Sequence, residues 1–270
     1  MRTLYSPEHE QFREQVRRFC EREIKPHYRD WEKAGHSPRE FWRKAGEHGM
    51  LCTTIPTEYG GPGGDFLHAC VVTEEMVRVG ANLGIPVHSD MVSPYLLHYG
   101  SEALKQKFLP RLCAGEIIGS IGMTEPGTGS DLKNIRTHAV RDGDDYVING
   151  QKVWITNGFN CGVVLVACKT DPAAGAKGVS LIAVEEGTPG FSRSQPMDKI
   201  GLKAQDTAEL FFDNVRVPAS NLLGEEGRGF VYLMQQLAQE RLVIAMRSTA
   251  TLEHQLEQTI RYTTDRKVFG

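Results

Sequence analysis

The sequence lacks the features of several large protein classes. Basic residues are not in excess, since 31 lysines and arginines face 34 aspartates and glutamates for a net charge of −3, which argues against a nucleic-acid-binding protein. No apolar run approaches the ~20 residues that a membrane helix needs, and Val163–Cys168 is among the longest. The N-terminus, Met1 to Tyr5, lacks the apolar core of a signal peptide, so we expect a bacterial-type cytoplasmic protein.

Metal and redox motifs are also missing. The six cysteines show no C-x-x-C spacing, and the nine histidines form no H-E-x-x-H pair. The glycine-rich segment Tyr59–Asp65 lacks the lysine of a phosphate-binding P-loop and is interpreted as a turn. The sequence therefore predicts neither a metal site nor a redox pair of cysteines.

The composition that remains is ordinary for a globular protein, with 40% hydrophobic and 24% charged residues. Ser6-Pro7-Glu8 is a typical helix start, with a capping hydroxyl, a proline in the first turn and an acidic residue behind it. Ser37–Glu40 repeats this pattern. Apolar periodicity predicts further helices at residues 66–79, 91–99 and 102–112. We expect an all-helical domain over residues 1–117.

The pattern changes after Ile117. Short β-branched or alternating runs are separated there by turns such as Asp142–Asp145 and Gly187–Gly190. The predicted strands include Tyr146–Ile148, Val163–Val166, Val179–Val184 and Leu210–Phe212. This spacing predicts an antiparallel barrel or sandwich in a domain of residues 118–222. A helical pattern then resumes, and we expect residues 223–270 to begin a C-terminal helical domain.

The most specific stretch is Ile121–Asp131, which reads Ile-Gly-Met-Thr-Glu-Pro-Gly-Thr-Gly-Ser-Asp. Its glycines permit positive φ and leave backbone N–H groups free to point at one anion. The hydroxyls of Thr124, Thr128 and Ser130 add donors that suit a phosphate or a flavin edge. Taken alone, this segment could be an ordinary surface turn. Trp154–Gly158, which reads Trp-Ile-Thr-Asn-Gly, adds a flat indole and another hydroxyl.

Together these two segments resemble the flavin-binding signatures of the acyl-CoA dehydrogenase family, and the resemblance extends from Ser6 to Gly270. It implies an α+β multidomain fold with a helical domain, a β domain and a C-terminal four-helix bundle, of which this chain carries only the first long helix. It also implies FAD as cofactor, an acyl-CoA substrate, an electron-transfer flavoprotein as partner and a homodimer or homotetramer. Because the family continues past Gly270, we expect the 270-residue chain alone to be poorly stable and to lose FAD readily.

Oxidation of an acyl-CoA to its 2-enoyl product needs a base for the α proton and an acceptor for the β hydride. The candidate base is Glu240, in Gln239-Glu240-Arg241-Leu242. Helical periodicity places it beside Leu233 on an apolar arc, where burial would raise its pKa. The other members of the predicted arc are Phe230, Leu237 and Ile244. From the residues alone, Glu240 could equally be partly exposed or paired with an arginine. The resemblance favours the base, because long-chain and isovaleryl-type members carry their catalytic glutamate in this Glu-Arg-Leu setting.

The resemblance also implies the binding residues. Those assigned to FAD are Ile121, Met123, Thr124, Gly129, Ser130, Trp154, Ile155, Thr156 and Arg266. Trp154 would cover the isoalloxazine and Thr156 would hydrogen-bond near flavin N5, while Arg266 would bind the FAD pyrophosphate of a neighbouring subunit. From the residues alone, Trp154 could be a core indole and Arg266 a solvated charge. The residues assigned to the acyl-CoA substrate are Ser130, Gln239 and Arg241.

Two alternatives to this function stay open. Within the same fold, the protein would be an acyl-CoA oxidase or a flavin monooxygenase, and oxygen consumption would distinguish them. As a different class, it would be a non-catalytic remnant of the family that associates with intact subunits. Val231 also stands where long-chain relatives carry a tyrosine, so the acyl or CoA contact there is expected to differ.

Overall fold

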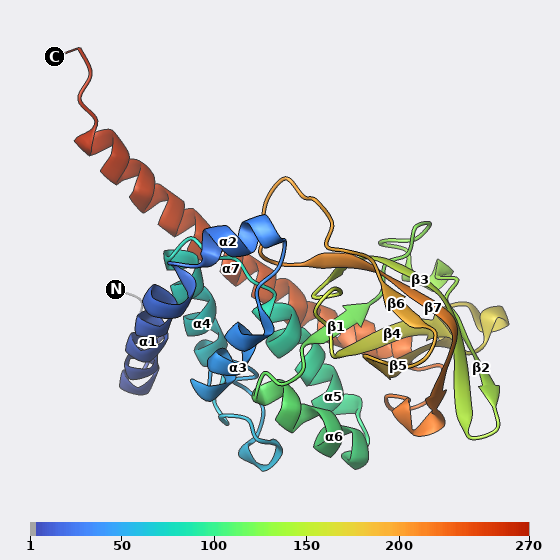
Figure 1. The fold of residues 1–270 in the computed structure, drawn as a ribbon. Coiled ribbons are helices and arrows are strands. Elements are labelled where there is room, and N and C mark those ends of the chain that lie inside the picture. The colour runs from blue at the N-terminus through green and yellow to red at the C-terminus, as the bar shows by residue number, and fades with distance from the viewer. Residues whose placement is uncertain (1–3, 270) are drawn as a thin grey trace.

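The computed structural model describes residues 4–269 and divides into a helical half and a β half, both spanned by one long helix (Figure 1). The helices before the sheet are α1 (Pro7–Phe19), α2 (Tyr28–Ala34), α3 (Arg39–Glu47), α4 (Phe66–Arg78), α5 (Ser93–Tyr99) and α6 (Glu102–Cys113). Two π-helical segments, Cys20–Ile24 and Val87–Val92, continue α1 and lead into α5. Both helix starts predicted from Ser-Pro pairs are confirmed, and the short α2 is an element that the sequence did not reveal.

The N-termini of α1 and α4 are capped by reciprocal hydrogen bonds that meet each other. Ser6 accepts from the backbone N–H of His9 and donates its own N–H to His9 Nδ1 at 3.0 Å. Asp65 and His68 form the same box on α4, and His9 Nε2 lies 3.0 Å from Asp65 Oδ1. Burial alone would raise the pKa of Asp65, but the hydrogen bonds from His9 and His68 outweigh it and lower the pKa to about 2.

This double cap also gathers potential metal ligands. The ligand atoms of His9, Asp65 and His68 lie within 4.8 Å of one another. Their mutual hydrogen bonds account for their positions as helix caps. The expectation that the protein has no metal site stays a prediction.

The β half is one curled, seven-stranded sheet. Its strands are β1 (Gly119–Gly122), β2 (His138–Asp142), β3 (Asp145–Thr156), β4 (Val163–Lys169), β5 (Val179–Glu185), β6 (Phe191–Arg193) and β7 (Thr207–Pro218). They follow the order β1-β4-β2-β3-β7-β6, with β5 paired to β4. The fold class is confirmed, and the sheet is mixed rather than wholly antiparallel. The reason is that β1 enters from the helical half and pairs parallel to β4, where Ile121 lies opposite Leu165.

Two hydrophobic cores share the central strands. Alternate residues of β4 point to opposite faces, so that Val163 and Leu165 join the core of the helical half. Val164 and Val166 join a second core between the strands of the β half. Every residue of β4 is therefore buried, as its unbroken apolar run suggests. The domain limits at residues 117 and 222 stay predictions.

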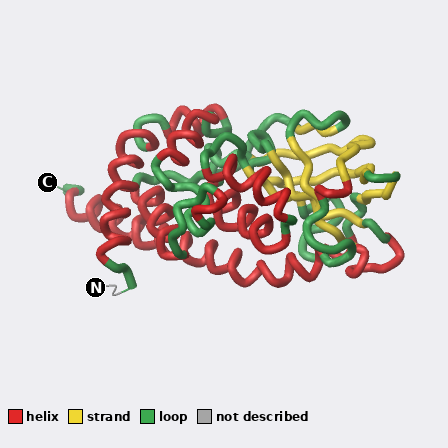
Figure 2. The backbone as a smooth tube through the Cα atoms, turned by 90° about the horizontal axis from the view of Figure 1, so that it is seen from below, coloured by secondary structure: helices red, strands yellow, loops and turns green. Residues whose placement is uncertain are grey.

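The last helix, α7 (Gly229–Asp265), is about 55 Å long and runs from the β half past the helical half (Figures 1 and 2). Its packed face contains Leu233, Val243 and Ala250, whereas Ile244 is 42% exposed. The predicted apolar arc was therefore wrong at Ile244, and the packed face is turned toward Val243. Within residues 4–269, no helix is both long and apolar enough to cross a membrane.

Candidate active site

The loop after β1 is fixed by a buried ion pair. Lys152 Nζ lies 2.8 Å from Glu125 Oε1 and also donates to the carbonyl of Met123 at 3.1 Å. Glu125 accepts two further hydrogen bonds, from the backbone N–H groups of Arg136 at 2.6 Å and Thr137 at 3.0 Å. Burial alone would raise the pKa of Glu125, but Lys152 and these donors outweigh it and lower it. Burial lowers the pKa of Lys152, and Glu125 opposes that shift.

Beyond this pair the loop opens to solvent. At both Gly127 and Gly129 an added Cβ would meet nothing within 4 Å, and Ser130 is exposed. On the near side, the carbonyl of Thr124 accepts the N–H of Val153 at 2.9 Å. The loop therefore lies beside the end of β3, and the two segments with the most specific sequence patterns are brought together.

Trp154 stands out at the end of β3. Its side chain is 65% exposed, so the alternative of a core indole is wrong. Its backbone has φ 62°, a left-handed conformation that bulky residues rarely adopt and that often marks functional sites. An exposed, flat aromatic surface held in this way is suited to stacking on a planar ligand.

Thr156 and Gln205 lie next to Trp154 and leave one polar atom without a partner. Gln205 Nε2 lies 3.4 Å from Thr156 Oγ1, and the backbone carbonyl of Thr156 accepts from Ser120 Oγ at 2.8 Å. Gln205 Oε1 is buried and has no hydrogen-bond partner. A buried acceptor left unpaired costs free energy, and such an atom is commonly satisfied by an absent ligand or water.

Glu240 approaches from α7. It is partly buried, and Tyr95 on α5 donates its hydroxyl to Glu240 Oε1 at 2.8 Å. Burial raises the pKa of Glu240, and the hydrogen bond from Tyr95 offsets part of that shift. Burial and the nearby carboxylate also raise the pKa of Tyr95. Within the described residues no arginine pairs with Glu240, so the alternative of a structural ion pair is wrong there.

The helical half connects Glu240 to the end of β3. Tyr95 belongs to α5, which continues directly from the π-helical segment Val87–Val92. Just before that segment, the carbonyl of Gly84 accepts from Asn157 Nδ2 at 2.9 Å, and the same amide donates to the carbonyl of Gly119 in β1 at 3.2 Å. An added Cβ at Gly84 would lie 1.7 Å from Asn157 Oδ1, so only glycine permits this approach. The carboxylate and the exposed indole are thus held by one continuous set of contacts.

The other predicted residues fall into two groups. Ile121 and Ile155 are buried in the cores, so their side chains cannot contact a ligand and only their backbone could. Gln239 is half-buried, while Arg241 and Arg266 are exposed. Arg266 follows the last turn of α7, where its guanidinium contacts the Tyr262 hydroxyl and lies 5.7 Å from that ring.

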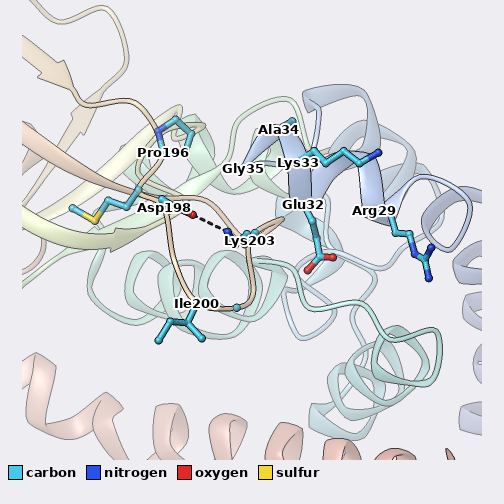
Figure 3. Close-up of a pocket in the computed structure, with 11 residues that line it drawn as sticks. Arg29, Glu32, Lys33, Ala34, Gly35, Pro196, Asp198, Ile200 and Lys203 are labelled. Carbon is cyan, nitrogen blue, oxygen red and sulfur yellow. Dashed lines mark hydrogen bonds and ion pairs between the residues drawn. The ribbon is translucent and has the colours of Figure 1, made fainter.

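A cavity of about 780 Å³ lies elsewhere, between α2 and the loop that precedes β7 (Figure 3). Glu32 and Lys33 line it from α2, and Asp198 and Lys203 form an ion pair of 2.7 Å across the loop. None of the predicted site residues lines this cavity. Its size alone therefore does not make it part of the site.

Comparison with known proteins agrees with this arrangement. The acyl-CoA dehydrogenase N-terminal domain matches residues 6–116, the middle domain matches residues 120–215 and the C-terminal domain matches residues 227–270. A crystal structure of acyl-CoA dehydrogenase from Geobacillus kaustophilus is 51% identical with a TM-score of 0.97, over 100% of this chain and 72% of that one. The chain belongs to the acyl-CoA dehydrogenase family.

Two curated relatives place this acyl-CoA dehydrogenase chain more closely. The long-chain specific enzyme of Sus scrofa mitochondria is 50% identical over all of this chain and 64% of its own length. The mitochondrial isovaleryl-CoA dehydrogenase of Oryza sativa subsp. japonica is 38% identical over 99% of this chain and 66% of its own. The chain thus spans about two thirds of the length of these relatives.

The residues of this acyl-CoA dehydrogenase chain fit the flavin that the family implies. The exposed indole of Trp154, the unpaired acceptor of Gln205 and the open backbone around Gly129 lie on neighbouring segments. A planar ring with both donor and acceptor edges would match such a set. Sequence reasoning missed Tyr95, Gln205 and the Glu125–Lys152 pair. Only Glu125 and Lys152 carried a signal, because each lies inside or next to a recognised motif.

Proposed function

We propose that this chain carries out the FAD-dependent oxidation of an acyl-CoA thioester to the 2-enoyl-CoA, with the electrons passed to an electron-transfer flavoprotein. The observation that carries this proposal is the partly buried Glu240 carboxylate, held by Tyr95 and free of any basic partner in the described part of the chain. The names of the relatives, long-chain specific and isovaleryl-CoA dehydrogenase, support the substrate class.

The cofactor proposal rests on the indole and hydroxyl at the end of β3. A glutaryl-CoA dehydrogenase structure from Mycobacterium smegmatis in complex with FADH2 is 33% identical to this chain with a TM-score of 0.89, which supports FAD. When bound, FAD supplies the acceptor for the hydride that leaves the β carbon. Trp154 would stack on its ring system, and Thr156 and Gln205 would offer hydrogen bonds to its edge. A matching chain from a structure of the electron transferring flavoprotein of Acidaminococcus fermentans, 32% identical, supports the partner.

The protein itself supplies the base. Tyr95 occupies Oε1 of Glu240, and Oε2 has no hydrogen bond within residues 4–269. Oε2 would take the proton from the α carbon of the thioester, while the hydrogen bond fixes the orientation of the carboxylate. Burial makes Glu240 a stronger base than a solvated carboxylate, and Tyr95 keeps enough of it ionised to act near neutral pH. Ser130, Gln239 and Arg241 would hold the CoA portion.

The test replaces Glu240 with glutamine, which keeps its size and removes its charge. In FAD-loaded protein, we expect Glu240→Gln to slow flavin reduction by acyl-CoA by ~10²-fold or more. Binding of FAD should not change, as followed by flavin absorbance and titration. Glu257→Gln is the matched control, because Glu257 is an exposed residue of the same helix. Flavin reduction as fast in Glu240→Gln as in wild type would show that the base lies elsewhere.

A further inference from the structure

Arg247 lies on the same side of α7 as the proposed base. It follows Glu240 by seven residues, which is two helical turns, so the two Cα atoms are about 10 Å apart along the helix axis. Both side chains lie on the packed face, and both are partly buried. The base and this guanidinium are therefore two polar groups on one otherwise apolar face.

The guanidinium of Arg247 is poorly satisfied. Its Nη1 donates to Asn82 Oδ1 at 3.1 Å, and within residues 4–269 no carboxylate pairs with it. Burial lowers the pKa of Arg247, and no acidic group opposes that effect. Arg13, by contrast, is also largely buried and lies 2.6 Å from Glu74 and 3.4 Å from Glu75. A partly buried cation without a counter-ion is costly, which indicates that an anion joins it in the working protein.

Asn82 places this cation on the wall of the proposed site. The backbone N–H of Asn82 donates to Tyr28 Oη at 3.0 Å, which fixes the segment after α4. Two residues later, Gly84 receives the hydrogen bond from Asn157, the neighbour of Thr156. The half-buried Val87 and Met91 then offer apolar surface on the way to Tyr95. The wall thus runs from Glu240 and Tyr95, along apolar side chains, to Asn82 and Arg247.

We propose that Arg247 is a specificity-determining residue that binds a carboxylate at the far end of the acyl chain, so that ω-carboxyacyl-CoA thioesters are substrates. This inference rests on the proposed function, because it requires the acyl chain to start at Glu240. A guanidinium has five donors in a planar fork that matches a carboxylate, and Asn82 uses one of its amino groups. The asparagine amide holds the fork in place without neutralising it.

The test compares two ligands of equal chain length, an ω-carboxyacyl-CoA and the uncharged acyl-CoA, over a series of lengths. Binding to FAD-loaded Glu240→Gln protein is measured by calorimetry, and flavin reduction is measured in protein with Glu240 intact. We expect Arg247→Gln to weaken binding of the ω-carboxy ligand by about 10- to 100-fold and to leave the uncharged ligand within about threefold. Arg247→Lys should restore part of the loss, because it restores the charge. Arg261→Gln, at an exposed position of α7, is the control and should change neither ligand.

The outcomes separate this inference from the function on which it rests. If the uncharged acyl-CoA binds and reduces the flavin while Arg247→Gln changes both ligands equally, the inference is wrong and the proposed function stands. If the wild-type protein rejects every ω-carboxyacyl-CoA in the series but accepts uncharged chains, the inference is likewise overturned. If neither ligand binds at any length, the proposed function is wrong and the inference falls with it.

Discussion

Replacing Tyr95 with phenylalanine tests how the structure tunes its base. The substitution removes the hydroxyl that donates to Glu240 Oε1 at 2.8 Å and keeps the ring, which is buried. A hydrogen bond to a charged group contributes about 1.5–3 kcal/mol, and one pKa unit corresponds to about 1.4 kcal/mol. Because Tyr95 stabilises the charged form, its loss should raise the pKa of Glu240 by about 1–2 units, in the same direction as burial.

The assay is the rate of flavin reduction by acyl-CoA as a function of pH, measured by stopped flow under limiting substrate. The base must be ionised, so the acidic limb of the profile should move to higher pH by about 1–2 units in Tyr95→Phe. Well above that limb the rate should stay within an order of magnitude of wild type. Tyr99→Phe is the control, since Tyr99 stacks on Tyr232 and bonds Gln235 rather than Glu240. A limb that stays in place or moves to lower pH, or an equal shift in Tyr99→Phe, would refute the reasoning.

Three further predictions concern the cofactor and the fold. Thr156→Val should weaken FAD binding by about 0.5–1.5 kcal/mol, and Trp154→Ala should weaken it more because a stacking surface is lost; equal affinities in a fluorescence titration would contradict this placement. Lys152→Met should lower the free energy of unfolding by about 3–5 kcal/mol because it leaves Glu125 buried without its counter-ion, and Glu125→Gln in the same chain should recover part of the loss in denaturant melts. Burial raises the pKa of Asp90 to about 7, so the fold loses stability as pH rises from about 4 to 7, where the unfolded chain is ionised and the folded carboxyl is not. Asp90→Asn should therefore gain stability over wild type between pH 5 and pH 8, by up to about 4 kcal/mol, and a gain independent of pH in thermal melts would exclude this cause.

Local patterns were sufficient for the features that depend on neighbouring residues. The cap at Ser6, the helices after Phe66 and the strands at Val163 and Val179 follow from residues a few positions apart, and the structure confirms them. The packed face of α7 was harder to predict, because Leu237 and Ile244 extend the apolar pattern beyond the part of the helix that packs. Periodicity gives the width of an apolar stripe but not which edge of it meets a neighbour.

Contacts between distant residues were not predictable in the same way. Tyr95 reaches Glu240 across 145 positions and Arg247 reaches Asn82 across 165, and neither pair shares a local pattern. Gln205 lies 49 positions from Thr156 and looks like an ordinary loop residue in the sequence. The parallel pairing of β1 with β4 depends on how the helical half delivers the chain to the sheet. Such contacts are decided by the tertiary fold.

The path of α7 has a consequence for the cooperativity of unfolding. The helix begins at Gly229, where an added Cβ would lie 2.7 Å from the backbone of Ser180 in β5, and it continues to Arg247 against the segment after α4. Neither half can unfold without removing partners from the same helix. The two halves should therefore unfold in one transition, and Glu240 should keep its position relative to β3 until that transition begins.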